Sequence, residues 1–189
     1  LLNSAGVTTP MYATLQNGDV VGTVDAFNFT ISPYIPGEQQ SRPTLALAQS
    51  FGETLAKIHV ALQSAKSLVT SNPAQWLDVA NARHEITRCS DELRTELTTR
   101  LDKAQSILSS GLPVSVIHGD LFPENTFTAN DELTVVFDLE TAQYTCRLLD
   151  VARTYVSFAF DKRLDPAALQ SALFEGYNEA ASLKLTPDE

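Results

Sequence analysis

One stretch near the middle of the chain constrains its fold more than any other. It has the sequence HGDLFPEN and occupies residues 118–125, directly after the apolar segment 114–117. The apolar segment predicts a short strand, and two β-prone segments after residue 125 predict a hairpin. The hairpin ends at Asp138, so the chain is expected to return to Asn125 and to bring these two side chains together.

The spacing of the polar residues in this stretch follows a known pattern. His118, Asp120 and Asn125 have the order H-x-D-x-x-x-x-N, which resembles the catalytic loop of protein kinases. In that loop the aspartate reaches the hydroxyl that accepts a phosphoryl group, while the asparagine and a later aspartate hold magnesium. The resemblance therefore implies Asp120 as the catalytic residue, and Asn125 and Asp138 as the magnesium ligands.

Among kinase-like proteins, the chain resembles the small-molecule kinases: aminoglycoside phosphotransferases, choline kinases and homoserine kinases. In these families a D-F-D or D-F-E triplet follows the hairpin, and here residues 138–140 have the sequence DLE. The segments LFP (121–123), LDVA (149–152) and EGY (175–177) resemble homoserine kinases most. The resemblance covers about residues 29 to 180. It implies an α+β, protein-kinase-like fold, ATP and Mg²⁺ as cofactors, and a small molecule with a hydroxyl group as the acceptor.

The resemblance also divides the chain into two parts. Residues 1–36 are expected to form a partial small β-lobe with the hinge, and residues 37–189 the mainly helical catalytic lobe. Within the small lobe, residues 11–15 predict a strand that reverses at Asn17-Gly18, the strongest two-residue hairpin signal. A further β-segment is predicted over residues 27–31.

The hinge between the two lobes is expected near residues 32–35. In kinase-like families the backbone of this segment meets the adenine edge of the nucleotide, which implies Ser32, Tyr34 and Ile35 as nucleotide-binding residues. Taken alone, the sequence of residues 35–37, IPG, predicts an ordinary turn. Its position just before a helix favours the hinge.

Apolar periodicity predicts the helices of the catalytic lobe. The first begins after Thr44, and His59 on its buried face is expected to be a hydrogen-bonded core residue. A loop with a short helical turn around Trp76 follows, and Trp76 is expected to pack in the core or between the lobes. The remaining helices are predicted over residues 86–108, 148–160 and 165–183.

Further residues near the loop receive separate hypotheses. His118 is expected to support the loop backbone by hydrogen bonds and not to transfer a proton. Glu140 has three open roles, as a metal ligand, a substrate contact or a solvated residue, and Glu124 faces either the substrate or water. The family resemblance implies that Asp150 lies near the catalytic loop. Arg153, one helical turn later, is expected to pair with Asp150.

The composition excludes several classes of partner. The formal net charge is −10, whereas nucleic acids and anionic membranes bind clustered Lys and Arg, so neither is expected. No apolar run approaches the roughly 18 residues of a membrane span. Two distant cysteines, Cys89 and Cys146, predict neither a disulfide framework nor a zinc site. A cytoplasmic location is expected, and the oligomeric state is left open.

Two classes of function follow from these patterns. The first is ATP- and magnesium-dependent transfer of the γ-phosphoryl group to a hydroxyl of a small amine-bearing metabolite. Homoserine is the first choice of acceptor, with an aminoglycoside, choline or another amino alcohol as the alternative, and Arg147 is the candidate cation for the carboxylate of homoserine. The second is a kinase-like domain that binds a nucleotide or a partner without turnover. The presence of Asp120, Asn125 and Asp138 favours the enzyme.

The first residues and the lysines carry one more expectation. Residues 1–6 predict the last turn of a helix closed by a glycine, which implies further sequence upstream. Kinase-like folds hold the α- and β-phosphates with a small-lobe lysine, but the first lysine here, Lys57, follows the hinge. Residues 1–189 alone are therefore expected to bind ATP weakly without turnover. They are also expected to expose apolar surface over residues 11–31.

Overall fold

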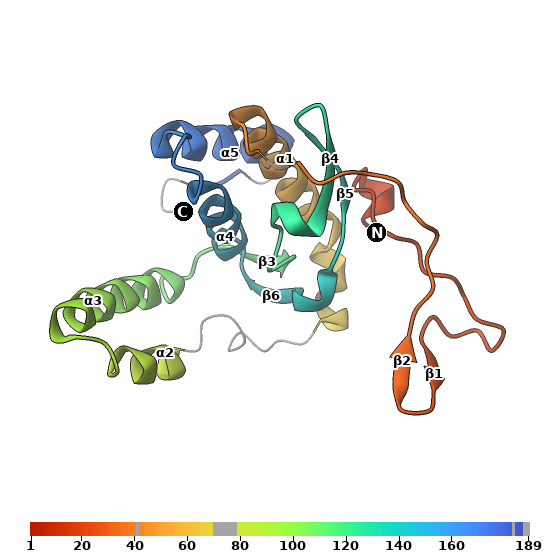
Figure 1. The fold of residues 1–189 in the computed structure, drawn as a ribbon, viewed down its shortest axis with the longest axis horizontal. Coiled ribbons are helices and arrows are strands. Elements are labelled where there is room, and N and C mark those ends of the chain that lie inside the picture. The colour runs from red at the N-terminus through yellow and green to blue at the C-terminus, as the bar shows by residue number, and fades with distance from the viewer. Residues whose placement is uncertain (41, 70–78, 183, 187–189) are drawn as a thin grey trace.

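The computed structural model describes residues 1–40, 42–69, 79–182 and 184–186, and within them the chain has a mainly helical α+β fold with three two-stranded sheets (Figure 1). The predicted fold class is therefore confirmed. The α-helices are α1 (Leu45–Ala61), α2 (Val79–Ile86), α3 (Asp91–Leu108), α4 (Arg147–Ala159) and α5 (Pro166–Ala180). The strands are β1 (Gly22–Val24), β2 (Phe27–Phe29), β3 (Val114–Ile117), β4 (Thr126–Ala129), β5 (Glu132–Val136) and β6 (Gln143–Cys146). Short 3₁₀ helices are η1 (Asn3–Ala5), η2 (Gln63–Leu68), η4 (Pro123–Asn125) and η5 (Leu139–Thr141).

Helices α1 and α5 pack closely against each other. Two glycines permit this approach: a Cβ atom at Gly52 would lie 2.1 Å from the backbone oxygen of Leu173, and one at Gly176 would lie 2.0 Å from that of Gln49. Helix α4 packs against both. Together these helices bury most of the apolar core, which includes Leu47, Phe51, Leu55, Ile58, Val151, Phe158, Leu169, Leu173 and Tyr177.

Three of the predicted helices are confirmed. Helix α1 begins directly after Thr44, whose hydroxyl accepts a hydrogen bond from the backbone N–H of Leu47 (3.1 Å). Helix α4 lies within one residue of its predicted bounds, and α5 begins after Asp165, whose carboxylate caps the N–H of Ala168. Helix α5 ends at Ala180, before its predicted end at residue 183, because Ala181 is already extended. Trp76 with its predicted turn lies outside the described residues.

The single long helix predicted over residues 86–108 is wrong. The chain forms two helices, α2 and α3, separated by residues 87–90. The sequence Ser90-Asp91-Glu92 supplies the reason, because a serine followed by two acidic residues is a helix-start signal that interrupts the apolar periodicity. Both helices project from the body, and Leu101 is the buried residue of α3 (Figure 1). Most of the predicted apolar stripe is therefore only half-buried.

Two antiparallel sheets surround the HGD stretch. Strand β3 pairs with β6, with Val114 opposite Cys146 and Ile117 opposite Gln143. The β3 prediction is confirmed, whereas β6 was not predicted, because its sequence QYTC is too short to give a periodic signal. Strands β4 and β5 form the predicted hairpin.

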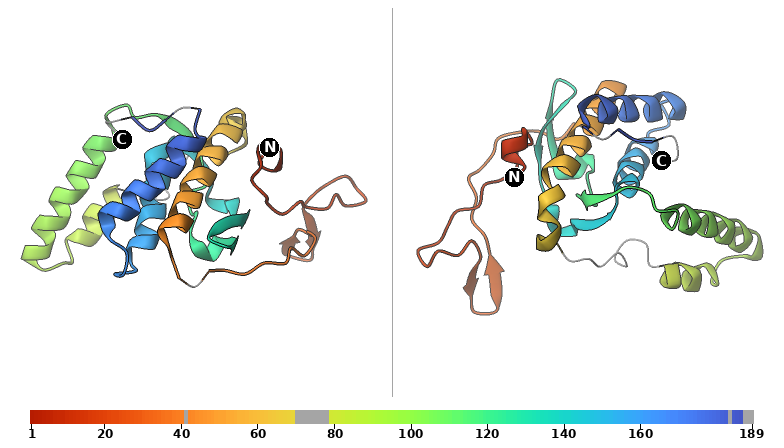
Figure 2. Two further views of the ribbon diagram at one scale, coloured as in Figure 1. Left: turned by 90° about the horizontal axis from the view of Figure 1, so that it is seen from above. Right: turned by 180° about the vertical axis from the view of Figure 1, so that it is seen from behind.

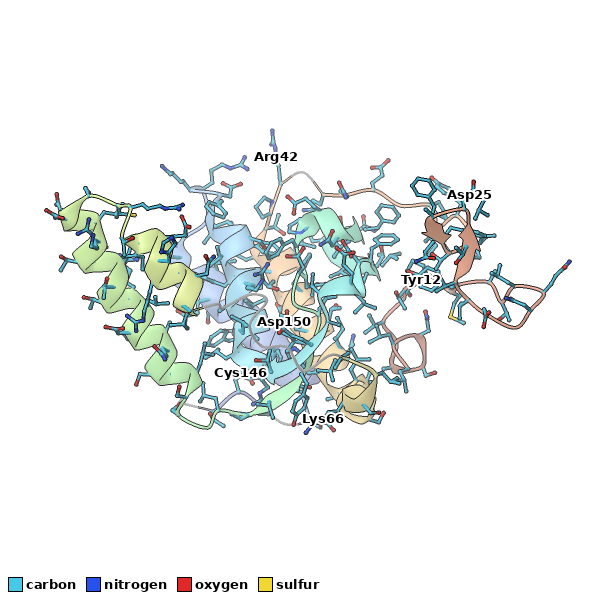
Figure 3. The ribbon with its side chains drawn as sticks, turned by 90° about the horizontal axis from the view of Figure 1, so that it is seen from below. Tyr12, Asp25, Arg42, Lys66, Cys146 and Asp150 are labelled. Atoms are coloured by element: carbon cyan, nitrogen blue, oxygen red, sulfur yellow. The ribbon has the colours of Figure 1, made fainter. Side chains whose placement is uncertain are left out.

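The N-terminal segment differs from its prediction. No strand is assigned to residues 11–15, and the hairpin strands are β1 and β2, with Gly22 opposite Phe29. The chain does turn near Asn17, where the N–H of Gly18 donates to the carbonyl of Leu15. The part of the segment that carries β1 and β2 extends away from the helices on the side opposite α2 and α3 (Figure 2), and Asp25 lies at the tip of this hairpin (Figure 3). The expected exposure of apolar side chains is present at Met11, Tyr12, Val20, Val21, Val24, Phe27, Phe29 and Ile31.

Further expectations concerned the cysteines, a membrane span and the first residues of the chain. Both cysteines are free thiols. In the described part of the chain, every helix is too short or too polar to cross a membrane. Residues 3–5 form the short helix η1, which the N–H of Gly6 closes by donating to the carbonyl of Asn3.

Replacing Gly176 with alanine is expected to lower the free energy of unfolding by about 1–3 kcal/mol, because the added methyl group overlaps the backbone of α1. Alanine has a higher helix propensity than glycine, so a loss of stability would have to come from the contact between the helices. Urea denaturation near neutral pH measures the change. Gln170→Ala, at an exposed position of α5, is the matched control and should change stability by less than about 0.5 kcal/mol. A Gly176→Ala variant as stable as the wild type would contradict the close helix contact.

Candidate active site

The backbone of the HGD stretch is held by a buried carboxylate. Asp150, on α4, is fully buried, and its two oxygens accept hydrogen bonds from the backbone N–H groups of His118 (2.8 Å) and Gly119 (2.9 Å). The imidazole of His59 on α1 approaches the same carboxylate at 3.1 Å. Figure 3 shows Asp150 inside the body between the helices. The loop thus begins from a backbone fixed by α4.

The hydrogen bonds of Asp150 outweigh the cost of its burial. Burial alone raises the pKa of the Asp150 carboxyl, but the hydrogen bond with His59, the electrostatic attraction of the His59 and His118 side chains and the N–H of His118 lower it. The net result is a pKa below the ordinary value of an aspartate. Asp150 is therefore held as a carboxylate at neutral pH.

Both ring nitrogens of His118 are used within the loop. Its Nδ1 accepts from the backbone N–H of Asp120 (3.2 Å), and its Nε2 lies 2.9 Å from the carbonyl oxygen of Phe137, to which it donates. His118 is fully buried. Since each nitrogen has a fixed partner, this side chain ties the loop to the end of β5 and has no free nitrogen for proton transfer.

Gly119 makes a tight bend that other residues would not tolerate. Its φ of +84° lies in the left-handed region, and a Cβ atom there would stand 2.7 Å from the carbonyl oxygen of Thr141. The hydroxyl of Thr141 in turn donates to the carbonyl of His118 (2.9 Å). The glycine therefore lets η5 close directly over the start of the loop.

The side chain of Asp120 is held from two sides. The amide nitrogen of Asn125 donates to Asp120 Oδ2 and to the Asp120 carbonyl, both at 2.9 Å. Arg153 Nη2 donates to Asp120 Oδ1 at 2.8 Å. Arg153 was predicted to pair with Asp150, and that prediction is wrong, because both oxygens of Asp150 face the loop backbone and His59. The side chain of Asp120 remains 24% exposed, enough to meet a ligand.

The hairpin brings Asp138 back beside Asn125. The N–H of Phe137 donates to the backbone carbonyl of Asn125 (2.9 Å), and Thr126 pairs with Val136 in the hairpin register. Asp138 follows with a φ of +61°, a conformation that aspartate tolerates better than most residues, and turns the chain into η5. Its exposed side chain, with that of Glu140, lines a pocket of about 660 Å³.

The remaining predicted residues lie at the surface. Glu124 is exposed and lines a second pocket, of about 390 Å³, together with Ser157 of α4 and Phe160, the residue after that helix. The proposed hinge residues Ser32, Tyr34 and Ile35 lie in an extended segment outside regular structure, where Tyr34 is 87% exposed.

Arg147 does not lie where its predicted role requires. The side chain is buried, with only 3% of the residue exposed. Its Nη2 donates to the carbonyl of Lys184 (2.7 Å), and its guanidinium stands over the ring of Tyr177. The N–H of Arg147 bonds to Pro113, before the start of β3, whereas the HGD stretch follows its end. The prediction that Arg147 binds an acceptor carboxylate is therefore wrong.

The family of the chain is decided by comparison with known proteins. A family model described as the phosphotransferase enzyme family matches residues 1–183. The chain belongs to the phosphotransferase enzyme family. The resemblance inferred from the motifs is thus confirmed.

Several curated relatives of the chain are named homoserine kinases. Those of Rhodopseudomonas palustris strains BisA53 and BisB5 are 29% and 30% identical over 188 and 187 residues, which is 97% and 96% of this chain and 57% of each relative. The chain therefore spans little more than half the length of these relatives.

Solved structures are similar in fold. An aminoglycoside-3′-phosphotransferase of type VIII has a TM-score of 0.66 at 17% identity, over 99% of this chain and 72% of that one. An amicoumacin kinase in complex with AMP-PNP and Ca²⁺ has a TM-score of 0.70 at 14% identity, over 97% of this chain and 60% of that one. At these identities the likeness shows the fold alone.

The oxygen atoms near the loop fit a magnesium ion. The Asn125 amide nitrogen donates to Asp120, which leaves its side-chain oxygen as the ligand atom, and the exposed carboxylate of Asp138 follows the residue whose N–H bonds to the Asn125 carbonyl. Magnesium is commonly bound by one or two carboxylates, with waters and substrate phosphates completing its shell. Across residues 1–40, 42–69, 79–182 and 184–186, no three His, Cys, Asp or Glu side chains gather into a metal cage.

Two contacts of the candidate site were missed from the sequence. The ion pair of Arg153 with Asp120 joins residues 33 apart in the chain, and the Thr141 contact with His118 joins residues 23 apart. A helical periodicity does place Arg153 one turn after Asp150, on the side of α4 that faces the loop. That signal could have directed Arg153 to the loop, but not to a particular carboxylate.

Replacing Asp150 with asparagine is expected to lower the free energy of unfolding by about 1–3 kcal/mol at neutral pH, because one buried loop N–H then faces an amide nitrogen. Thermal or urea denaturation measures the loss. Glu96→Gln, which alters an exposed ion pair with Arg100, is the control and should change little.

The same variant carries a pH signature. Because the pKa of Asp150 is lowered on folding, its stabilisation is fully present above the ordinary aspartate pKa of about 3.9 and is lost as the pH falls toward the folded value. The stability difference between wild type and Asp150→Asn should therefore shrink below about pH 4. A difference that stays constant or grows on acidification would contradict the ionised state of Asp150.

Proposed function

We propose that this protein transfers the γ-phosphoryl group of ATP to a hydroxyl group of a small amine-bearing metabolite. One observation carries the proposal: Asn125 is bonded both to Asp120 and to the end of the hairpin that leads to Asp138. Its amide nitrogen bonds to the carboxylate of Asp120, and its backbone carbonyl bonds to the residue before Asp138. A proton-accepting carboxylate therefore lies next to two oxygen ligands, which is the arrangement that kinase chemistry needs.

Asp120 is proposed to orient the acceptor hydroxyl and to receive its proton. The hydroxyl oxygen forms a bond to the γ-phosphorus, the bond from that phosphorus to the bridging oxygen breaks, and ADP leaves. Asp120 starts this step with hydrogen bonds to both of its oxygens, from Arg153 and Asn125. These two bonds fix the orientation of the carboxylate, so its main contribution is to position the hydroxyl while the proton leaves late.

Asn125 and Asp138 are proposed to hold the magnesium ion. A bound magnesium ion would offset the negative charge of the phosphates. Ser32, Tyr34 and Ile35 are proposed to meet the adenine of ATP, a role that rests on their position in the chain before the catalytic lobe. Glu140, exposed beside Asp138 in the 660 Å³ pocket, is suited to the metal or its bound waters.

Homoserine is the acceptor that we favour. Relatives named homoserine kinase match nearly the whole chain at about 29% identity, and the exposed carboxylate of Glu124 next to the loop suits an ammonium group. An aminoglycoside, choline or another amino alcohol is the alternative. The pocket beside Glu124 has a volume of about 390 Å³, at the small end of the range for ligand sites, which favours the smaller acceptors.

A nucleotide-binding domain without turnover is the second candidate. The observation in its favour is the ion pair between Arg153 and Asp120, since Arg153 occupies one oxygen of the carboxylate that would have to receive the acceptor hydroxyl. Steady-state measurement of ADP release by the full-length protein separates the two functions.

Asp120→Asn in the full-length protein is expected to lower turnover by at least about 10²-fold, the usual scale for a positioned acid or base, with little change in ATP affinity. The amide retains the shape of the side chain but cannot receive the proton. Coupled measurement of ADP release against homoserine gives kcat, and nucleotide titration gives the affinity. Asp102→Asn, on the projecting helix α3, is the control. Near-normal turnover by Asp120→Asn would overturn the assignment of Asp120.

Asp138→Ala in the full-length protein is expected to reduce activity to background and to remove its dependence on magnesium. The reason is that Asp138 supplies the only charged ligand in the proposed pair. ADP release across a magnesium titration measures both effects, with Asp102→Ala as the control. If Asp138→Ala kept a normal magnesium dependence, the ion would have to bind elsewhere.

A further inference from the structure

The segment that follows the proposed hinge is bonded to the β4–β5 hairpin. Residues 37–40, here called the linker, pass beside β4, where the N–H of Thr128 donates to the carbonyl of Glu38 (2.9 Å) in an antiparallel bridge. The side-chain amide of Gln39 donates to the carbonyl of Glu124 (2.6 Å) in the HGDLFPEN stretch. The residues proposed to meet adenine are therefore joined to the catalytic loop by hydrogen bonds as well as by the chain itself.

The carboxylate of Asp131, at the turn between β4 and β5, receives two side chains from the same part of the chain. Its Oδ1 accepts from the side-chain nitrogen of Gln40 (2.8 Å) and from the hydroxyl of Thr44 (2.7 Å), the residue that also caps α1. The hydrogen bond from Gln40, followed by that from Thr44, lowers the pKa of the Asp131 carboxyl, and burial offsets only part of the effect. The hairpin turn is thereby fixed both to the linker and to the start of α1.

We propose that Asp131 is a positioning residue that fixes the spacing between the adenine site and the magnesium site of this protein; the inference rests on the nucleotide site proposed above. Asp131 acts through the backbone, because it lies at the end of the hairpin opposite Asn125 and Asp138. The bridge between Glu38 and Thr128 is a single residue pair, which sets the register of two strands only weakly. The hydrogen bonds to Asp131 supply the second anchor that fixes this register.

Aromatic contacts connect the position of the linker to the proposed magnesium ligands. A Cβ atom at Gly37 would lie 2.3 Å from the ring of Phe127, so the linker backbone packs directly against that ring. Phe127 meets the ring of Phe137 edge-on, with the ring centroids 4.7 Å apart. Phe137 precedes Asp138, and its N–H donates to the carbonyl of Asn125. A shift of the linker along β4 would therefore displace the residues that lead to both ligands.

ATP spans both sites, which makes its affinity sensitive to their spacing. Its adenine is proposed to bind at the hinge and its phosphates at the magnesium ion. A ligand with two ends gains from its second contact only when the two sites are placed at its own length. Adenosine and magnesium tripolyphosphate each occupy only one site, so the spacing matters for ATP and not for either fragment.

The test measures the Kd of three ligands for the full-length protein by calorimetric titration: AMP-PNP with magnesium, adenosine, and tripolyphosphate with magnesium. Asp131→Gly removes the carboxylate, and glycine tolerates the φ of +63° at this position. This variant is expected to raise the Kd of AMP-PNP about 5- to 20-fold, the scale of one or two hydrogen bonds, and to leave the Kd of each fragment unchanged.

Two further variants serve as matched controls. Asp131→Asn retains a side-chain oxygen that can accept from both Gln40 and Thr44, so it should bind all three ligands nearly as the wild type does. Asn130→Gly makes a similar backbone change at the neighbouring φ of +53°, where the side chain is exposed, and should also leave the three Kd values unchanged.

A second variant keeps the test decisive if Asp131→Gly does not fold. Gln40→Met removes one donor to the same oxygen without altering the turn, and the same selective loss of AMP-PNP affinity is expected. Equal losses for all three ligands, or an unchanged Kd for AMP-PNP, would overturn the inference, as would a wild type that does not bind AMP-PNP. ADP release is measured in parallel. A wild type that released no ADP but showed the selective loss would refute the phosphotransferase proposal and leave the role of Asp131 standing.

Discussion

The carboxylate of Asp150 is the interaction on which the candidate site depends. A fully buried charge is tolerated only when its oxygens are satisfied, and here two backbone N–H groups of the loop and one imidazole do so. The same bonds fix the direction in which the chain leaves β3, because they hold His118 and Gly119 at the bend. Asp120 then follows in a defined orientation. Without this carboxylate the loop would have two buried donors and no partner for them.

The packing of α1 against α5 holds the histidine that bonds to this carboxylate. Gly52 and Gly176 allow α1 and α5 to approach through their backbones, and Tyr177 directly follows the second glycine. The hydroxyl of Tyr177 lies 2.8 Å from Nδ1 of His59, whose other nitrogen meets Asp150. This arrangement sets the imidazole to accept from the tyrosine and to donate to the carboxylate. His59 is therefore the hydrogen-bonded core histidine that its place on the buried face of α1 predicted, and it transmits the position of the helix pair to the loop.

The local charges of the site contrast with the charge of the whole chain. A net charge of −10 repels a phosphorylated ligand at long range, so the cations that act on it must be gathered locally. Arg153 is a cation inside the candidate site, and it is bonded to the carboxylate of Asp120. The ion pair and the amide of Asn125 together hold the Asp120 carboxylate in one orientation. Orientation of this kind is the main contribution that a catalytic loop makes to phosphoryl transfer.

The sequence by itself determined the elements whose signals are local. Apolar periodicity and the Thr44 and Asp165 caps located α1, α4 and the start of α5, and the spacing from Asp120 through the hairpin to Asp138 predicted which residues come together. Local signals failed where two of them disagreed. At Ser90 the apolar periodicity predicted one continuous helix, but a helix-start signal divided it into α2 and α3.

Only the tertiary structure decided the partners of the charged side chains. Arg153 bonds to Asp120, 33 residues away, and not to its helical neighbour Asp150, while Arg147 is buried against Tyr177. The periodicity of a sequence predicts only which residues, three or four positions apart, share one face of a helix. Which carboxylate then lies opposite that face depends on how α4 packs against the loop and α1. Solvent, backbone N–H groups and other side chains compete for each charged group, and the partner is fixed only when those elements pack together.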